Sequence, residues 1–267
     1  MLCGDTMNRN NIEKIAQTPE DKVLLRKVWD KLNRGIQTNV MANSPFLTPR
    51  ELEMCRYLFG DTPGIYRFGG YPEAERQMLV YLPEYLDESV LTNEDSPIVC
   101  IHADFYEADT LTHRDLLGAL MGSGIARETV GDILIHGNQC DFLVTEQIAP
   151  YLLQHLTSAG RTKLSLSQIP LDTLTPPEPQ VKEIRDTLAS LRLDSVVASG
   201  FRMGRSLASQ HISAGKVAID GLPCEKPDKN VTEGAKISLR GSGKIKLVSI
   251  GGRTKKDRIS VIIHRYV

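Results

Sequence analysis

The sequence of 267 residues has no apolar run that approaches the roughly 20 residues needed to cross a bilayer. Its first residues, MLCGDTMNRNN, lack the apolar stretch of a secretory signal peptide, so we expect a cytoplasmic protein with no membrane span. The five cysteines are scattered, and no two have the close spacing of a zinc or redox pair. We therefore expect free thiols in a reducing compartment, at Cys3, Cys55, Cys100, Cys140 and Cys224.

A strong overall charge is also missing, because the formal net charge is -1. With 24% charged and 41% hydrophobic residues, the composition excludes a disordered chain, a collagen and a coiled coil. The charge is nevertheless uneven. Residues 182–267 carry 17 Lys and Arg against 8 Asp and Glu, a net charge of +9, whereas residues 1–181 carry 15 against 25, a net charge of -10. This asymmetry indicates a polyanionic partner for the C-terminal region alone.

Two stretches divide the chain into regions. Three prolines within Thr175–Pro179 predict an extended linker, which falls where the charge changes sign. The polar run Thr92–Pro97 is typical of a loop. We therefore predict an α+β protein with domains at 1–95, 96–175 and 181–267.

The first region is predicted to be mainly helical with a β-hairpin. Thr18–Asp21 and Thr48–Glu51 are typical helix starts, each with a proline in the first turn and an acidic residue three positions after the threonine. Apolar residues follow both at helical spacing. Ile65–Phe68 and Gln77–Leu82 are predicted strands that flank the loop Gly69–Arg76.

The middle region is predicted to be a ferredoxin-like plait of order βαββαβ. The expected strands lie at 98–105, 132–136, 140–145 and 163–169, with helices in between. Residues 96–178 have a net charge of -6, and the strand at 140–145 offers only Phe142 for stacking on a base. We therefore expect this domain to position a partner or to contact protein rather than to bind RNA independently.

The C-terminal region is predicted to begin with a helix, because Val181, Ile184, Leu188 and Leu191 follow helical spacing. Two short helices come next, followed by several strands, with Asp220-Gly221 as a two-residue hairpin turn. This order resembles the small RNA-binding domain named after ribosomal protein S4, also called the αL motif, over residues 188 to about 240. The matching residues are Arg192-Leu193-Asp194, Gly204-Arg205-Ser206, Ala208, Ile212, Gly215-Lys216-Val217, Asp220-Gly221, Lys226-Pro227, Val231 and Gly234.

The resemblance implies RNA binding by two basic helices and the strand after them, and the residues favour it independently. The helix that follows Gly204 presents free N–H groups and its positive dipole end to a phosphate, and basic side chains surround it. The competing interpretation is a solvated basic face in which an Arg192–Asp194 pair serves only the fold. The candidate RNA-binding residues are Arg192, Arg202, Gly204, Arg205, Ser206, Gln210, Lys216, Lys226, Lys229, Arg253, Lys255 and Lys256.

The last three candidates lie in the basic stretch Gly251–Arg258, which is either a second phosphate clamp or a soluble hairpin tip.

The whole layout resembles the YlmH family of bacterial and plastid proteins, with Leu47–Glu51 and Phe68–Arg76 carrying the wider resemblance. The resemblance implies a ribosome-associated protein of the large subunit, linked to rRNA or tRNA, to translation and to the quality control of stalled chains. Some members are tied to cell division or to photosystem maintenance.

We expect a monomeric, non-catalytic protein without a cofactor or metal. For the loop at 69–76, an internally satisfied loop with Arg76 paired to Glu73 is favoured over a ribosome contact. The motif Arg192-Leu193-Asp194 mimics that of pseudouridine synthases, but Val197 stands where a hydroxyl residue belongs. No glycine-rich loop joins a strand to a helix as in nucleotide-dependent enzymes.

An RNA-modifying enzyme acting through the middle domain remains the alternative. His102 and Asp104 lie on one face of a predicted strand, with His136 and Cys140 on the neighbouring hairpin. These side chains could bind a metal or exchange protons. Polar residues at a sheet edge explain them equally well.

Overall fold

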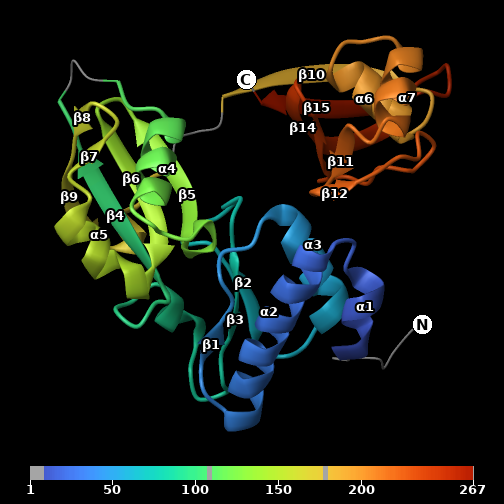
Figure 1. Cartoon of the computed structure of the whole chain (residues 1–267). Helices are drawn as coiled ribbons and strands as arrows, with labels where there is room; N and C mark the ends of the chain where they lie inside the picture. The colour runs from blue at the N-terminus through green and yellow to red at the C-terminus, as the bar shows by residue number, and fades with distance from the viewer. Residues whose placement is uncertain (1–8, 107–109, 177–179, 267) are drawn as a thin grey trace. The chain divides into compact units, whose positions relative to one another are not determined.

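The computed structural model describes residues 9–106, 110–176 and 180–266 of an α+β protein. It consists of two compact units, Met1–Pro177 and Glu178–Val267, which are taken in turn below (Figure 1). Cys3, most of the N-terminal segment used to exclude a signal peptide, and the end of the predicted linker lie outside the described residues. No helix in the described ranges is long and apolar enough to cross a membrane. The other four cysteines are buried free thiols.

The N-terminal part of unit 1 packs helices against a small sheet. Both predicted capping boxes are present, since Thr18 accepts a hydrogen bond from the Asp21 N–H and Thr48 accepts one from the Glu51 N–H. The predicted hairpin is also present, and a third strand joins it to give the order β1-β3-β2. The elements are α1 (Ile12–Ile15), α2 (Pro19–Thr38), β1 (Ala42–Asn43), α3 (Pro49–Phe59), β2 (Ile65–Phe68) and β3 (Met78–Tyr81).

The rest of unit 1 is the predicted βαββαβ plait. Its four strands form an antiparallel sheet of order β5-β6-β4-β9, and Leu116 and Leu152 of the two helices pack with Phe142 on one face of this sheet. The elements are β4 (Ile98–Asp104), α4 (His113–Gly122), β5 (Val130–His136), β6 (Gln139–Thr145), α5 (Ala149–His155), the hairpin β7 (Ser158–Ala159) and β8 (Thr162–Lys163), and β9 (Ser165–Ile169). Short 3-10 turns lie at Arg9–Asn11, Glu88–Leu91, Arg127–Thr129, Glu146–Ile148 and Leu171–Thr173.

The second face of the plait sheet is partly covered by the N-terminal part. Phe46 and Met78 lie in one buried cluster with Ile98, Cys100 and Leu143 of the sheet. The backbone joins the two parts as well, because the Phe46 N–H donates to the Glu128 carbonyl at 2.8 Å. Unit 1 therefore has a hydrophobic core that is continuous across residue 95, where the sequence suggested a boundary.

The loop Gly69–Arg76 is fastened to the plait by Asp132 of β5. This carboxylate accepts hydrogen bonds from the Tyr71 hydroxyl at 2.7 Å and from the N–H groups of Glu75 and Arg76 at 2.7 and 3.0 Å. Arg76 is half-buried and donates to the carbonyls of Val130 and Phe46. The printed hydrogen bonds of the loop are therefore made within unit 1, and their main anchor is Asp132, a residue outside the loop that the sequence did not suggest. The positive φ of Gly70, +89°, permits the turn that brings Tyr71 to Asp132.

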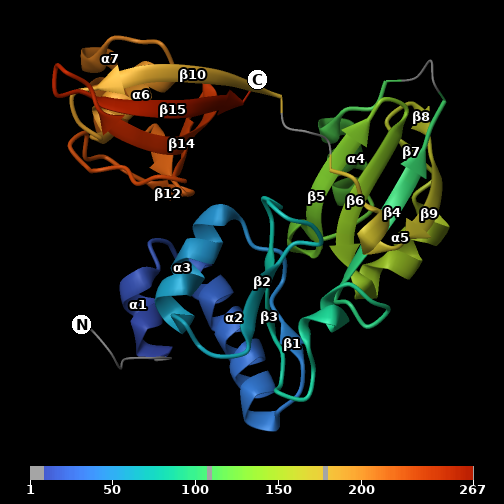
Figure 2. The same ribbon diagram turned by 180° about the vertical axis from the view of Figure 1, so that it is seen from behind.

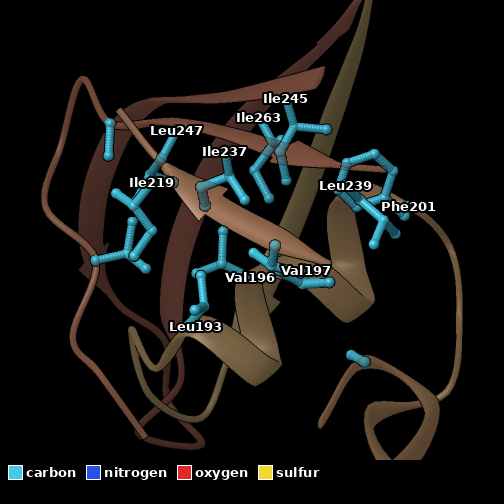
Figure 3. Packing of buried hydrophobic residues seen from close by; sticks show 14 of the residues in the cluster. Leu193, Val196, Val197, Phe201, Ile219, Ile237, Leu239, Ile245, Leu247 and Ile263 are labelled. Carbon is cyan, nitrogen blue, oxygen red and sulfur yellow. The ribbon is translucent and has the colours of Figure 1, made fainter. Parts of the chain in front are cut away.

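Unit 2 is a six-stranded antiparallel sheet with two helices on one face, as Figures 1 and 2 show from opposite sides. The strand order is β10-β15-β14-β13-β11-β12. Val196 and Val197 of α6 point toward Ile237, Ile245 and Ile263 of the sheet (Figure 3). The elements are β10 (Val181–Leu188), α6 (Leu193–Gly200), α7 (Arg205–Ser213), β11 (Val217–Ile219), β12 (Leu222–Pro223), β13 (Lys236–Leu239), β14 (Gly243–Arg253) and β15 (Ile259–Tyr266).

One predicted element of unit 2 is wrong. Residues 181–191 were expected to form a helix, but 181–188 form β10, which pairs with β15 along its whole length. Ile184 and Leu188 are the buried residues of this strand, and a separation of four places two side chains on one face of either a helix or a strand. The partner strand, about 80 residues later in the sequence, decides between the two.

Replacement of Asp21 tests the capping box that begins α2. The hydrogen bonds from Arg50, together with those from the backbone N–H groups of Gln17 and Thr18, lower the pKa of Asp21 to about 2 although the side chain is buried. The ionised carboxylate therefore stabilises the fold above pH 4, and this stabilisation is lost as the pH falls toward 2. We expect Asp21→Asn to lower the free energy of unfolding by about 2 kcal/mol at pH 7 and by about half as much near pH 3.

Urea unfolding followed by the fluorescence of Trp29, the one tryptophan, measures this difference, since Trp29 is buried in the same core. A difference between Asp21→Asn and the wild type that does not change with pH would contradict the role given to the ionised carboxylate.

Replacement of Gly131 tests the close contact between the two parts of unit 1. A Cβ at Gly131 would lie 2.6 Å from Phe46 Cε1 and 3.1 Å from Leu143 Cβ. We expect Gly131→Ala to lower the free energy of unfolding by about 1–3 kcal/mol in thermal unfolding followed by circular dichroism. The control is Gly118→Ala on the exposed surface of α4, where a Cβ meets nothing within 4 Å. Gly118→Ala should raise the free energy of unfolding by about 0.5–1 kcal/mol. Equal effects of Gly131→Ala and Gly118→Ala would contradict the close contact at Gly131.

Candidate nucleic-acid interface

A buried carboxylate lies at the centre of the predicted RNA-binding face. Asp194, in the first turn of α6, is 3% exposed. Arg192 donates to it from Nε at 3.3 Å and from Nη2 at 3.1 Å. Arg205, at the start of α7, donates from Nη2 to both carboxylate oxygens at 3.2 and 3.0 Å. The two guanidinium groups therefore converge on one acid from two different helices.

This arrangement keeps Asp194 ionised. Burial by itself raises the pKa of a carboxyl group, but the hydrogen bonds from Arg192 and Arg205 outweigh burial and hold the pKa of Asp194 below its ordinary value. The two arginine side chains remain 40% and 52% exposed. The pair with Asp194 thus serves the fold, as the competing interpretation held, while much of each arginine side chain still faces solvent.

The start of α7 adds backbone donors to this face. Gly204 is the N-cap residue and provides no side chain to cap the helix. Ser206 and Gln210 are exposed, as is Arg205 in the first turn. Uncapped N–H groups at a helix start attract an anion by hydrogen bonding and by the helix dipole.

The segment at 226–230 lies against the start of α6. The Leu193 N–H donates to the Lys229 carbonyl at 2.8 Å, and the Asp194 N–H donates to the Pro227 carbonyl at 3.0 Å. These bonds bring the chain that bears the exposed Lys226 and Lys229 next to Arg192. We call the set Arg192, Arg205, Ser206, Lys226 and Lys229, together with the start of α7, the helix-start cluster.

The remaining predicted residues lie elsewhere in unit 2. Lys216 borders a shallow pocket of about 410 Å³, and Arg202 borders another of about 490 Å³. Gly243, at the beginning of β14, lines both pockets. Lys216 and Arg202 therefore both lie at the end of the sheet where the chain turns from β13 into β14.

The basic stretch near 253–258 lies at the opposite end of β14. At a rise of roughly 3.3 Å per residue, the 11 residues of β14 separate Arg253 from Gly243 by about 30 Å. Arg253 pairs with Asp257 at 2.6 Å, and Arg258 donates to Thr187. Lys255 and Lys256 are exposed in the turn between β14 and β15. The structure therefore does not bring this hairpin tip together with Lys216 and Arg202.

The middle domain joins His102 to Asp141, which the sequence analysis did not single out. His102 Nδ1 lies 2.6 Å from Asp141 Oδ1, and Nε2 lies 3.4 Å from Asp104 Oδ1. Burial lowers the pKa of His102, but the contacts with Asp141 and Asp104 outweigh it and leave the pKa raised. His136 Nε2 lies 3.5 Å from the other Asp141 oxygen, which is an ion-pair distance but not a hydrogen bond. Cys140 is buried, so burial raises its thiol pKa to about 12.

No group of three or more His, Cys, Asp or Glu residues within the described ranges is arranged to hold a metal ion. The side of the plait sheet that carries His102 has two halves, one covered by the N-terminal part and one polar. The strand positions of the polar half, read from the register, are His102, Asp104, His136, Gln139, Asp141, Ser165 and Ser167. None of these is Phe, Tyr or Trp, and Phe142 lies fully buried on the opposite face.

Several residues of unit 2 were missed by reading the sequence. Asp194 was seen only as a partner of Arg192, and its contact with Arg205 needs the packing of α6 against α7. Lys182 and Arg265 face each other on β10 and β15, a register that a helix at 181–191 would not allow. Lys182, Arg265, Arg240 and Lys244 line the two pockets beside Gly243.

Comparison with known proteins agrees with this description. A family model described as "Putative RNA-binding domain in YlmH" matches residues 101–173, and the S4 domain model matches residues 191–237. A curated protein of Bacillus subtilis (strain 168), "Ribosome-associated protein quality control protein P2", is 35% identical over 226 residues, which are 84% of this chain and 87% of that protein.

A solved structure, "Cell division protein ylmH from Streptococcus pneumoniae", is 18% identical, with a TM-score of 0.49 over 60% of this chain and 98% of that one. The match to the curated relative extends over most of both sequences, and the two family models fall on the plait of unit 1 and on the segment of unit 2 from α6 to the beginning of β13. This chain is a member of the YlmH family.

Proposed function

We propose that this protein is a non-catalytic RNA-binding protein that works as a cytoplasmic monomer on the large ribosomal subunit. Unit 2 holds ribosomal RNA or tRNA through the helix-start cluster, and the protein acts in ribosome-associated quality control. The observation that carries the proposal is the convergence of Arg192 and Arg205 on the buried Asp194 beside an uncapped helix start.

This geometry suits the phosphates of RNA. Asp194 fixes the two guanidinium groups, so less side-chain freedom is lost when a phosphate binds. Lys226 and Lys229 add two exposed charges nearby, and residues 182–267 carry a net charge of +9. The relative's name mentions the ribosome and quality control, and it supports the same role for this chain.

Unit 1 is proposed to position the protein or to contact protein partners. Residues 96–178 have a net charge of -6, and the uncovered half of the plait sheet offers no Phe, Tyr or Trp on which bases stack. The nitrogen Nδ1 of His102 is engaged by Asp141, which also faces His136. We assign these groups to the stability of the sheet and propose no reaction for them.

Sedimentation of a cell lysate tests the partner. The protein should travel with large ribosomal subunits in a sucrose gradient at low salt and leave them at high salt, because contacts to phosphates weaken as salt competes. A protein that stays at the top of the gradient under both conditions would contradict the proposal.

Substitution of the helix-start cluster tests the binding face. We expect the triple variant Arg205→Ala, Lys226→Ala and Lys229→Ala to bind a fluorescein-labelled RNA hairpin more weakly. The slope of log K against log salt should become shallower by about 2–3, since each lost phosphate contact removes about 0.7–0.9.

The matched control removes three exposed cations from unit 1, through Arg114→Ala, Arg161→Ala and Lys163→Ala. It should keep the affinity and salt slope of the wild type. Equal losses in the two triple variants would show that net charge, and not the helix-start cluster, governs binding.

A further inference from the structure

A pocket of about 490 Å³ opens at one end of the sheet in unit 2. Lys182 at the beginning of β10 and Arg265 near the end of β15 are register partners, so these two residues lie side by side in the sheet. Arg202 comes from the segment after α6, and the lining is completed by Tyr266, by Ser242 of the turn before β14 and by Gly243 at the beginning of β14. The pocket is within the size range of sites for small ligands.

The described residues that line this pocket include three cations and no carboxylate. Elsewhere in unit 2, Arg192 and Arg205 pair with Asp194, and Arg185 pairs with Glu183. By contrast, within the described ranges none of Lys182, Arg202 and Arg265 forms an ion pair. Three like charges around one hollow create a positive potential that an anion would relieve.

The backbone of Arg202 gives a second, independent indication. The Met203 N–H donates to the Ala198 carbonyl and the Arg202 N–H to the Ser199 carbonyl, which is the Schellman arrangement at the end of α6. Arg202 occupies the left-handed position of this motif, with φ +54°, where glycine is usual. A strained arginine with no carboxylate partner among the described residues fits a side chain that serves an external ligand.

Arg265 is held in place for such a ligand. Its guanidinium carbon lies 5.5 Å from the centroid of the buried Phe201 ring, so a ring supports the group from one side. Three cations around one hollow suit the several oxygens of a phosphate better than the two oxygens of a carboxylate.

We propose that Lys182, Arg202 and Arg265 form a binding site for a phosphate of the RNA backbone. This inference rests on the proposed RNA-binding function and adds a second contact point to it. Lys182, Arg265 and Tyr266 lie outside the segment that matches the S4 domain model. The neighbouring pocket is lined by Lys216, Arg240 and Lys244, and both pockets are lined by Gly243. The same RNA strand would pass from one pocket to the next.

The decisive variant is Arg202→Gly in the full chain, because it removes the charge and also relieves the backbone strain. We expect a melting temperature equal to or higher than that of the wild type. The affinity for a fluorescein-labelled RNA hairpin should fall about threefold to fivefold at low salt, and the salt slope should become shallower by about 1. Lys182→Ala, at an exposed position, should weaken binding by a similar factor.

Arg185→Ala is the matched control, since it removes a cation from the same strand outside the pocket. It should leave RNA affinity unchanged. If Arg202→Gly and Lys182→Ala both keep the wild-type affinity and salt slope while the helix-start triple variant loses them, the pocket is not an RNA site and the proposed function stands. If none of these variants weakens binding, both proposals fail.

Competition identifies the ligand class. A 5′-mononucleotide or inorganic phosphate at high concentration should compete with the hairpin only weakly, because each occupies one contact of an extended surface. Polyglutamate that displaces the hairpin from the wild type, and does so less well from Arg202→Gly, would assign the pocket to an acidic protein and overturn the RNA assignment.

Discussion

The buried carboxylate of Asp194 is the constraint on which the basic face of unit 2 depends. A charged group that is 3% exposed is costly unless it is paired and hydrogen-bonded. Asp194 therefore requires Arg192 and Arg205, and it fixes where both guanidinium groups lie. The same contact ties the start of α6 to the start of α7, so the local fold and the shape of the positive surface have one cause.

A comparable carboxylate organises unit 1. Asp132 accepts three hydrogen bonds from the loop at 69–76, and the hydrophobic core under this loop contains residues from both sides of position 95. One face of the plait sheet consequently packs against the two helices. Half of its other face packs against the N-terminal part. This burial removes much of the area on which a similar plait could bind RNA, and it leaves unit 2 as the principal basic surface.

Much of the fold could be predicted because its signals are local. Capping boxes at Thr18 and Thr48, the hairpin on either side of the loop at 69–76, and the alternation of strands and helices after Ile98 all depend on residues close in the sequence. The segment 181–188 could not be assigned in this way, since its burial pattern fits two structures. The site divides similarly: the basic residues were visible, but their division into a helix-start cluster, an end pocket and a distant hairpin tip depends on the register of a sheet.

The pairing of β10 with β15 has a consequence for how unit 2 comes to be folded. These neighbouring strands are the earliest and the latest strands of the unit, about 80 residues apart, and β15 also pairs with β14. Closing so long a loop costs entropy before any of its contacts can form, and non-local pairing of this kind slows folding. The pocket beside Lys182 and Arg265 therefore exists only once this long-range pairing is made.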